Sequence, residues 1–101
     1  MPDVRGARTL PPEALADLRR AFRAEVAARL PQLQAAHVGS GPEELADALR
    51  AAHSLSSSAV VLGEPEAARV ARRIETALAA GELAGVPAQV DVLVRLLGAW
   101  R

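Results

Sequence analysis

Residues 51–63 have the sequence AAHSLSSSAVVLG, and this stretch is the most informative part of the chain. Its alanines and leucines favour a helix, with His53 near the middle. A histidine in a core is surrounded by bulky apolar side chains, whereas the neighbours on the face of His53 are small. The stretch therefore predicts a helix that presents His53 to another protein and that Gly63 ends.

On both sides of this stretch, apolar residues repeat at steps of three and four, the spacing of amphipathic helices. We predict helices over about residues 12–36, 42–62 and 65–80, and a last one that Pro87 opens. The predicted inward faces are formed by Leu15, Leu18, Phe22, Val26, Leu30, Leu33, Leu45, Leu49, Ala52, Leu55, Ala59, Leu62, Val70, Ile74, Ala77, Leu78, Val90, Leu93, Val94, Leu97 and Trp100. Helices joined by short connections predict an all-α fold, an up-down antiparallel four-helix bundle.

Several residues predict where these helices begin, bend or end. Pro31 is expected either to kink the first helix or to split it in two. Ser40 and Glu43 have the spacing of a capping box before the second helix. Residues 1–10 are predicted to be a disordered lead-in, and residues 11–101 to form one helical bundle domain.

The composition argues against several classes of function. The 12 basic residues, all arginines, equal the 12 acidic ones, so no basic surface favours nucleic acid. Without cysteine and with only 2 histidines, a metal site is not expected, and no cofactor is predicted. The sequence contains no signal peptide and no apolar run long enough to cross a membrane, so we expect a cytoplasmic protein. Nothing demands a second copy, and we expect a monomer.

A known family has a similar pattern around a histidine. His53, Leu55, Ser58, Ala59 and Gly63 match the pattern His-x-Leu-Lys-Gly-Ser-Ala followed by a glycine-containing turn. The stretch therefore resembles the phosphoacceptor helix of histidine-containing phosphotransfer (HPt) domains, the carriers of two-component signalling. The similarity extends over roughly residues 12–98 and includes the segments FRAE at 22–25 and RIETAL at 73–78.

The resemblance implies a function for His53. It would accept a phosphoryl group from a histidine kinase catalytic domain or a phospho-aspartyl receiver, and pass it to the Asp of a response-regulator receiver domain. No glycine-rich phosphate loop is present, so the chain is not expected to be an enzyme with its own ATP site. In the chemotaxis-kinase type of HPt domain a Glu on the next helix orients the histidine, and an ungapped alignment puts this Glu at Glu75. Its carboxylate would accept the hydrogen of Nδ1 and leave Nε2 free to attack.

Two positions depart from the family pattern. Ser56 stands where the family has Lys, which favours the negative charge of the phosphoryl group, and Ser57 stands where it has Gly. Arg50 and Arg72 lie one turn before His53 and Glu75, so either can replace the Lys charge or both are solvated surface residues. Ser57 is still small enough for a partner to dock closely.

The remaining interpretations concern docking and the competing functions. Val60, two turns after His53, is either part of a docking patch or a residue at the edge of the core. His37, at the end of the first helix, is interpreted as structural or incidental. The two departures also allow a degenerate HPt-like bundle that docks receiver or kinase domains without accepting phosphate. A DNA-binding module and a small helical enzyme are less well supported, because neither a basic face nor a convergent set of catalytic residues is found.

Overall fold

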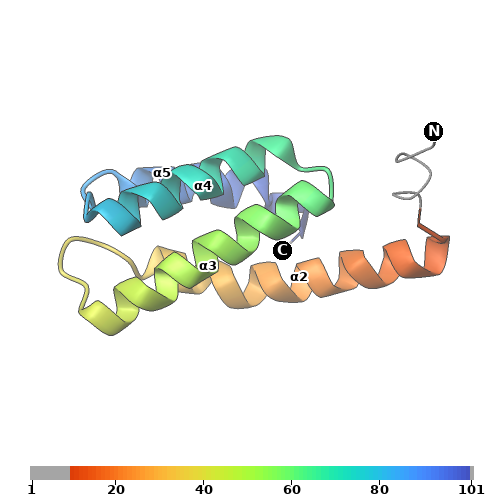
Figure 1. The fold of residues 1–101 in the computed structure, drawn as a ribbon, viewed down its shortest axis with the longest axis horizontal. Coiled ribbons are helices and arrows are strands. Elements are labelled where there is room, and N and C mark those ends of the chain that lie inside the picture. Colours follow the sequence, from red (N-terminus) through yellow and green to blue (C-terminus); the bar gives the residue numbers. More distant parts are fainter. Residues whose placement is uncertain (1–9, 101) are drawn as a thin grey trace.

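The computed structural model describes residues 10–100, which form four α-helices and a short 3-10 helix (Figure 1). They are α2 (Pro12–Gln34), α3 (Pro42–Val61), α4 (Pro65–Ala80), α5 (Val86–Leu96) and η1 (Gly98–Trp100). Residues 10–100 contain no strand, and the predicted all-α class is confirmed. The predicted disordered lead-in lies outside the described residues, apart from its last position, Leu10.

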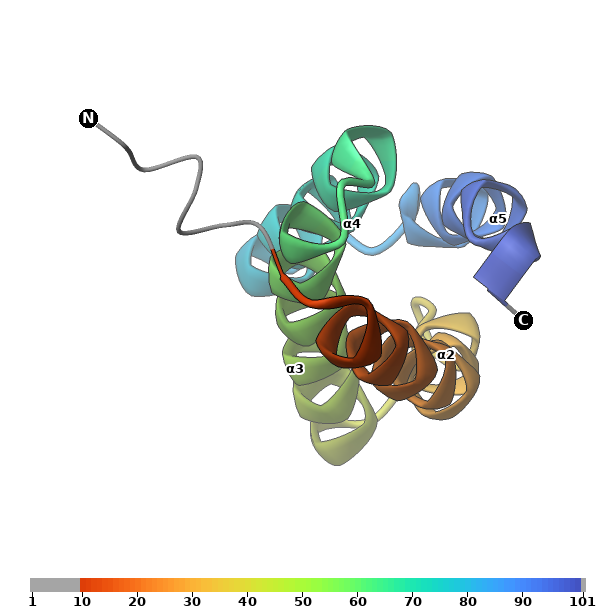
Figure 2. The same ribbon diagram turned by 90° about the vertical axis from the view of Figure 1, so that its right-hand side faces the viewer.

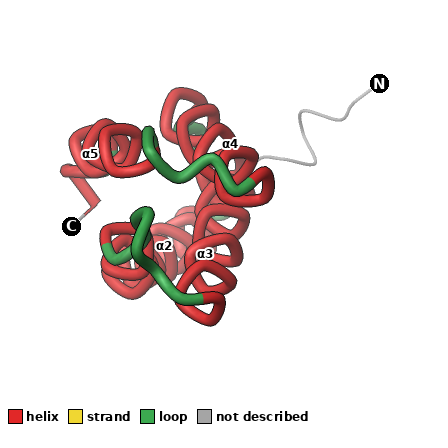
Figure 3. Tube along the Cα trace, turned by 90° about the vertical axis from the view of Figure 1, so that its left-hand side faces the viewer, coloured by secondary structure: helices red, strands yellow, loops and turns green. Residues whose placement is uncertain are grey.

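Consecutive helices run in opposite directions around one core (Figures 1 and 2). Helix α3 packs against α2 and α4, while α5 packs against α4 and also contacts α2. Figure 3 shows the α2–α3 and α4–α5 connections at the same end of the molecule, as alternating helix directions require. The up-down antiparallel four-helix bundle predicted from the sequence is therefore present.

The most extensive contact in the bundle joins α3 and α4. Many of the side chains that these two helices bury are alanines, namely Ala48, Ala51, Ala52, Ala59, Ala67, Ala68 and Ala71. The distance between packed helices depends on the size of the side chains at the contact, so small side chains permit a close approach. Exposed residues on α3 and α4 are consequently brought near each other along this junction.

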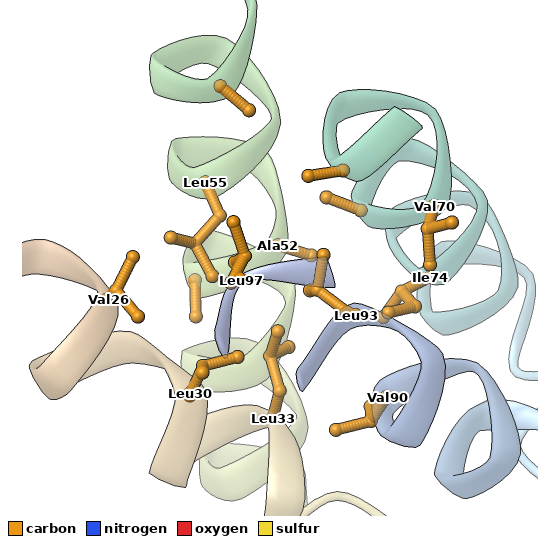
Figure 4. Packing of buried hydrophobic residues seen from close by; sticks show 14 of the residues in the cluster. Val26, Leu30, Leu33, Ala52, Leu55, Val70, Ile74, Val90, Leu93 and Leu97 are labelled. Atoms are coloured by element: carbon orange, nitrogen blue, oxygen red, sulfur yellow. The ribbon is translucent and has the colours of Figure 1, made fainter. Parts of the chain in front are cut away.

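Larger aliphatic side chains fill the space between the four helices (Figure 4). The labelled core residues are Val26, Leu30, Leu33, Ala52, Leu55, Val70, Ile74, Val90, Leu93 and Leu97. The two aromatic residues, Phe22 and Trp100, meet edge to face with ring centroids 4.8 Å apart. This contact ties the C-terminal 3-10 helix to the middle of α2.

Not every predicted inward residue is buried. The prediction for Leu15 is wrong, because its side chain is exposed. The first turns of α2 extend beyond the ends of the other helices, so none of the helices within residues 10–100 covers this position (Figure 1). Others among the predicted inward positions are only partly buried: Leu18, Leu45, Leu49, Leu62, Ala77 and Val94.

The predicted capping box of α3 uses a different pair of residues. The N-cap is Gly41, whose backbone N–H donates to Glu44 Oε1 at 2.9 Å, so the prediction of Ser40 and Glu43 is wrong. The Ser40 hydroxyl instead donates to the carbonyl of Ala35 at 3.0 Å and lies in the preceding loop. The α3 helix starts one residue later than the Ser-x-x-Glu spacing requires.

Pro31 neither splits α2 nor ends it, because the helix continues to Gln34. The backbone N–H of Ala35 donates to the Pro31 carbonyl at 3.0 Å, so the helical hydrogen-bonding pattern resumes directly after the proline. Pro31 and Ala27, four residues earlier, are both exposed, so the carbonyl that loses its amide partner faces water.

Helices α3 and α4 both end before a glycine, Gly63 and Gly81 respectively. Each glycine has a φ value of +74°, a left-handed conformation that glycine adopts readily after a helix.

Candidate functional site

His53 lies in the middle of α3, with 70% of its side chain exposed. Its neighbours Ala52 and Leu55 are buried, so the ring is on the outer face of a helix whose inner face is packed. This arrangement follows from helical geometry, because residues one and two positions away along a helix point in other directions. The predicted exposure of His53 is confirmed.

Glu75 of α4 reaches His53 across the α3–α4 junction. Its Oε2 atom lies 2.8 Å from Nδ1 of the imidazole, and its side chain is 29% exposed. An ionised carboxylate can only accept hydrogen bonds, so Nδ1 carries the hydrogen in this contact. The neutral ring then has its lone pair on Nε2, which has no hydrogen-bond partner among residues 10–100.

His53 and Glu75 lie in an open depression between α3 and α4. The other residues that line it are Ser56, Ser57, Arg72, Thr76, Ala79 and Ala80. Apart from the arginine, these side chains are small, so the surface around the imidazole is unobstructed. A group bound to Nε2 therefore has space, and a second protein can approach the ring.

The two serines that replace motif residues have different environments. Ser56 is only 4% exposed, so it belongs to the helix packing as well as to the edge of the depression. Ser57 is exposed and lines the depression together with His53. Val60 is 57% exposed, so its interpretation as a core-edge residue is wrong and the interpretation as an exposed apolar residue holds.

The two arginines predicted near the site, Arg50 and Arg72, have different environments in the structure. Arg50 forms an ion pair with Asp47, one turn earlier on α3. Arg72 lines the depression that contains His53, and the structure records no ion pair for it within residues 10–100. Only Arg72 shares the surroundings of the imidazole.

A further polar contact joins α2 to α3 beside this site. Glu25 of α2 accepts hydrogen bonds from the hydroxyls of Ser54 and Ser58, the latter at 2.6 Å. These contacts were not predicted, although the sequence places Glu25 between the apolar Phe22 and Val26 and has serines four residues apart at 54 and 58. Ser54 directly follows His53, so the contact helps to set the orientation of α3.

Three other features bear on the class of site. His37 accepts a hydrogen bond at Nδ1 from the Gly39 N–H at 2.9 Å, as expected for a residue that stabilises a loop. In the described part of the chain, no three His, Cys, Asp or Glu residues are grouped so that they could hold a metal ion. None of the helices between residues 10 and 100 is both long and apolar enough to cross a membrane.

Comparison with known families identifies the class of protein. The model of the Hpt domain family matches residues 17–101, which is most of the chain. The chain belongs to the Hpt family, whose members are phosphotransfer modules of two-component signalling. No curated protein and no solved structure matches it.

Proposed function

We propose that this domain is a phosphorelay carrier that accepts a phosphoryl group on Nε2 of His53. The observation that carries the proposal is the contact between Nδ1 of His53 and the Glu75 carboxylate, combined with the exposure of the ring. The contact selects the tautomer with a free Nε2, and the exposure makes that atom accessible. Membership of the Hpt family supports the same chemistry.

The transfer can be written from these two residues. The Nε2 lone pair attacks phosphorus, and the bond from phosphorus to the donor atom breaks, with its electron pair leaving on the donor. The ring keeps its hydrogen on Nδ1 and becomes positively charged, and the Glu75 carboxylate stabilises that charge. When a receiver Asp oxygen attacks phosphorus, the N–P bond breaks and its electrons return to Nε2, which restores the neutral ring.

The proposed partners are a histidine kinase catalytic domain and a response-regulator receiver domain. Their proposed docking surface includes the exposed Val60 and Ser57, which lie on the His53 side of α3. An apolar side chain on this surface can be buried by an incoming helix, and the small Ser57 allows a close approach. We further propose that the domain is of the chemotaxis-kinase type, because a Glu on the helix after the phosphoacceptor helix contacts the histidine. The proposal also includes a monomeric domain that acts in the cytoplasm.

Phosphorylation by a small phosphoramidate donor tests the proposal without a partner. The wild type and His37→Gln, which removes the other histidine, are expected to gain one acid-labile phosphoryl group by intact mass. His53→Gln is expected to gain none while keeping its helical circular dichroism spectrum. An adduct that persists in His53→Gln would contradict the assignment of the acceptor residue.

A second candidate function is docking of receiver or kinase domains without phosphate transfer. Ser56 and Ser57, in place of Lys and Gly, favour it, because the motif has lost its own cation. This function predicts a folded wild type that binds receiver domains yet gains no adduct. In that case the double substitution Ser56→Lys and Ser57→Gly is expected to restore phosphorylation.

A further inference from the structure

A phosphoryl group on His53 brings nearly two negative charges to a site that already contains the Glu75 carboxylate. Like charges at close range oppose each other, so a nearby cation would favour the phosphorylated state. The chain contains no lysine, and Ser56, at the position of the motif Lys, is almost fully buried and uncharged. A positive charge contributed by this domain must therefore come from an arginine elsewhere in the fold.

Most arginines near the site are already paired or face elsewhere. Arg50 is paired with Asp47 on α3. Arg69 of α4 is paired with Glu66, with 3.7 Å between Nη1 and Oε2. Arg73 lines a neighbouring depression that His53 does not reach.

Arg72 differs from each of these arginines. It lines the same depression as His53 and lies one turn before Glu75 on the α4 face that borders α3. No carboxylate within residues 10–100 forms an ion pair with it. The neighbouring Thr76 adds a hydroxyl to the same wall of the depression.

We propose that the Arg72 guanidinium binds the phosphoryl oxygens of phosphorylated His53 and so replaces the charge of the missing motif lysine. This inference rests on the proposed function. A guanidinium presents paired N–H donors that match two phosphoryl oxygens, and its long stem lets it reach them from α4. In this domain the cation therefore lies on α4, which also carries Glu75, and not on the phosphoacceptor helix α3.

The test compares initial phosphorylation rates with phosphoramidate for variants of the 101-residue chain. Arg72→Gln is expected to react about tenfold more slowly than the wild type, because it loses a charge-assisted contact to the phosphoryl group. Arg73→Gln, the matched substitution one position along the same helix, is expected to stay within about twofold. Arg72→Lys keeps the charge and is expected to recover most of the rate.

Two further measurements distinguish a charge role from a structural one. In ³¹P NMR, the phosphoryl group of the phosphorylated protein is expected to have a higher pKa in Arg72→Gln, because a cation favours the dianion. Adding Ser56→Lys to Arg72→Gln is expected to restore the rate, since it returns a cation to the position of the motif. Thermal unfolding of each variant checks that the fold is intact.

Several outcomes would overturn the inference. Equal rates for folded Arg72→Gln and Arg73→Gln would contradict the binding of the phosphoryl group by Arg72. A larger loss in Arg50→Gln would assign the role to Arg50 instead. A folded wild type that gains no phosphoryl group on His53 would overturn the proposed function and this inference together, whereas a phosphorylated wild type with insensitive Arg72 variants would overturn the inference alone.

Discussion

The Glu75 carboxylate lies 2.8 Å from Nδ1 of His53, although the two residues are 22 positions apart in the sequence. Replacing Glu75 by Gln keeps a hydrogen-bond acceptor but removes the negative charge. We expect the phosphorylation of His53 to slow by about tenfold, because the positively charged phosphorylated ring loses its counter-charge. Initial rates with phosphoramidate measure the effect, and Glu82→Gln, an exposed substitution outside the depression, is the control. Equal rates for both variants would exclude a role of the Glu75 charge in phosphorylation.

His53→Gln should separate function from stability. The side chain is largely exposed, so the free energy of unfolding is expected to change by less than about 0.5 kcal/mol. Urea unfolding followed by circular dichroism measures this change. A loss of several kcal/mol would mean that His53 supports the fold and is not simply presented to a partner.

Leu55 lies two residues after His53 and has the opposite environment, with 1% of its surface exposed. Leu55→Ala is expected to lower the free energy of unfolding by about 2–5 kcal/mol, because it leaves a cavity between the helices. Val60→Ala on the exposed side of the same helix is expected to cost much less. Similar costs for the two substitutions would contradict the orientation of α3 described here.

The contact of Glu25 with Ser54 and Ser58 predicts a coupling between α2 and α3. Glu25→Ala leaves two partly buried hydroxyls without their acceptor, and we expect a cost of about 1–2 kcal/mol. The substitutions Ser54→Ala and Ser58→Ala should lower the free energy of unfolding less in the Glu25→Ala variant than in the wild type. The reason is that the shared contact is already lost in Glu25→Ala. Strictly additive costs in the double-mutant cycle would show that the contact contributes nothing to stability.

Val60 provides a test of the proposed docking surface. Val60→Gln is expected to weaken transfer from phosphorylated His53 to receiver domains, measured against a panel of purified receivers, because it removes an apolar contact. Phosphorylation by phosphoramidate should not change, since that donor needs no docking surface. Val38→Gln, a substitution of another exposed valine, in the loop after α2, is the matched control. Unchanged transfer in Val60→Gln would move the docking surface elsewhere.

Local patterns in the sequence were enough to predict the helices and the side of α3 on which His53 lies. Apolar residues at helical spacing determine which face of a helix is buried, and prolines and glycines mark its ends. The predicted helix over residues 65–80 agrees with α4, for example, because Pro65 begins it and Gly81 follows it. The prediction of the α3 cap failed because the path of the loop puts Gly41, one residue after Ser40, at the N-cap with Glu44.

The relationships between helices were decided only by the tertiary structure. Spacing could not distinguish Arg50 from Arg72, since each lies one turn before a proposed site residue. Packing separates them, because Asp47 pairs with Arg50 on α3 while the α3–α4 junction places Arg72 in the depression of His53. The exposure of Leu15 depends in the same way on where the neighbouring helices end. The sequence by itself determined where the helices lie and that His53 is on the outer face of α3. The packing of one helix on another decided which exposed residues meet, because contacts between distant segments depend on distances that no local pattern contains.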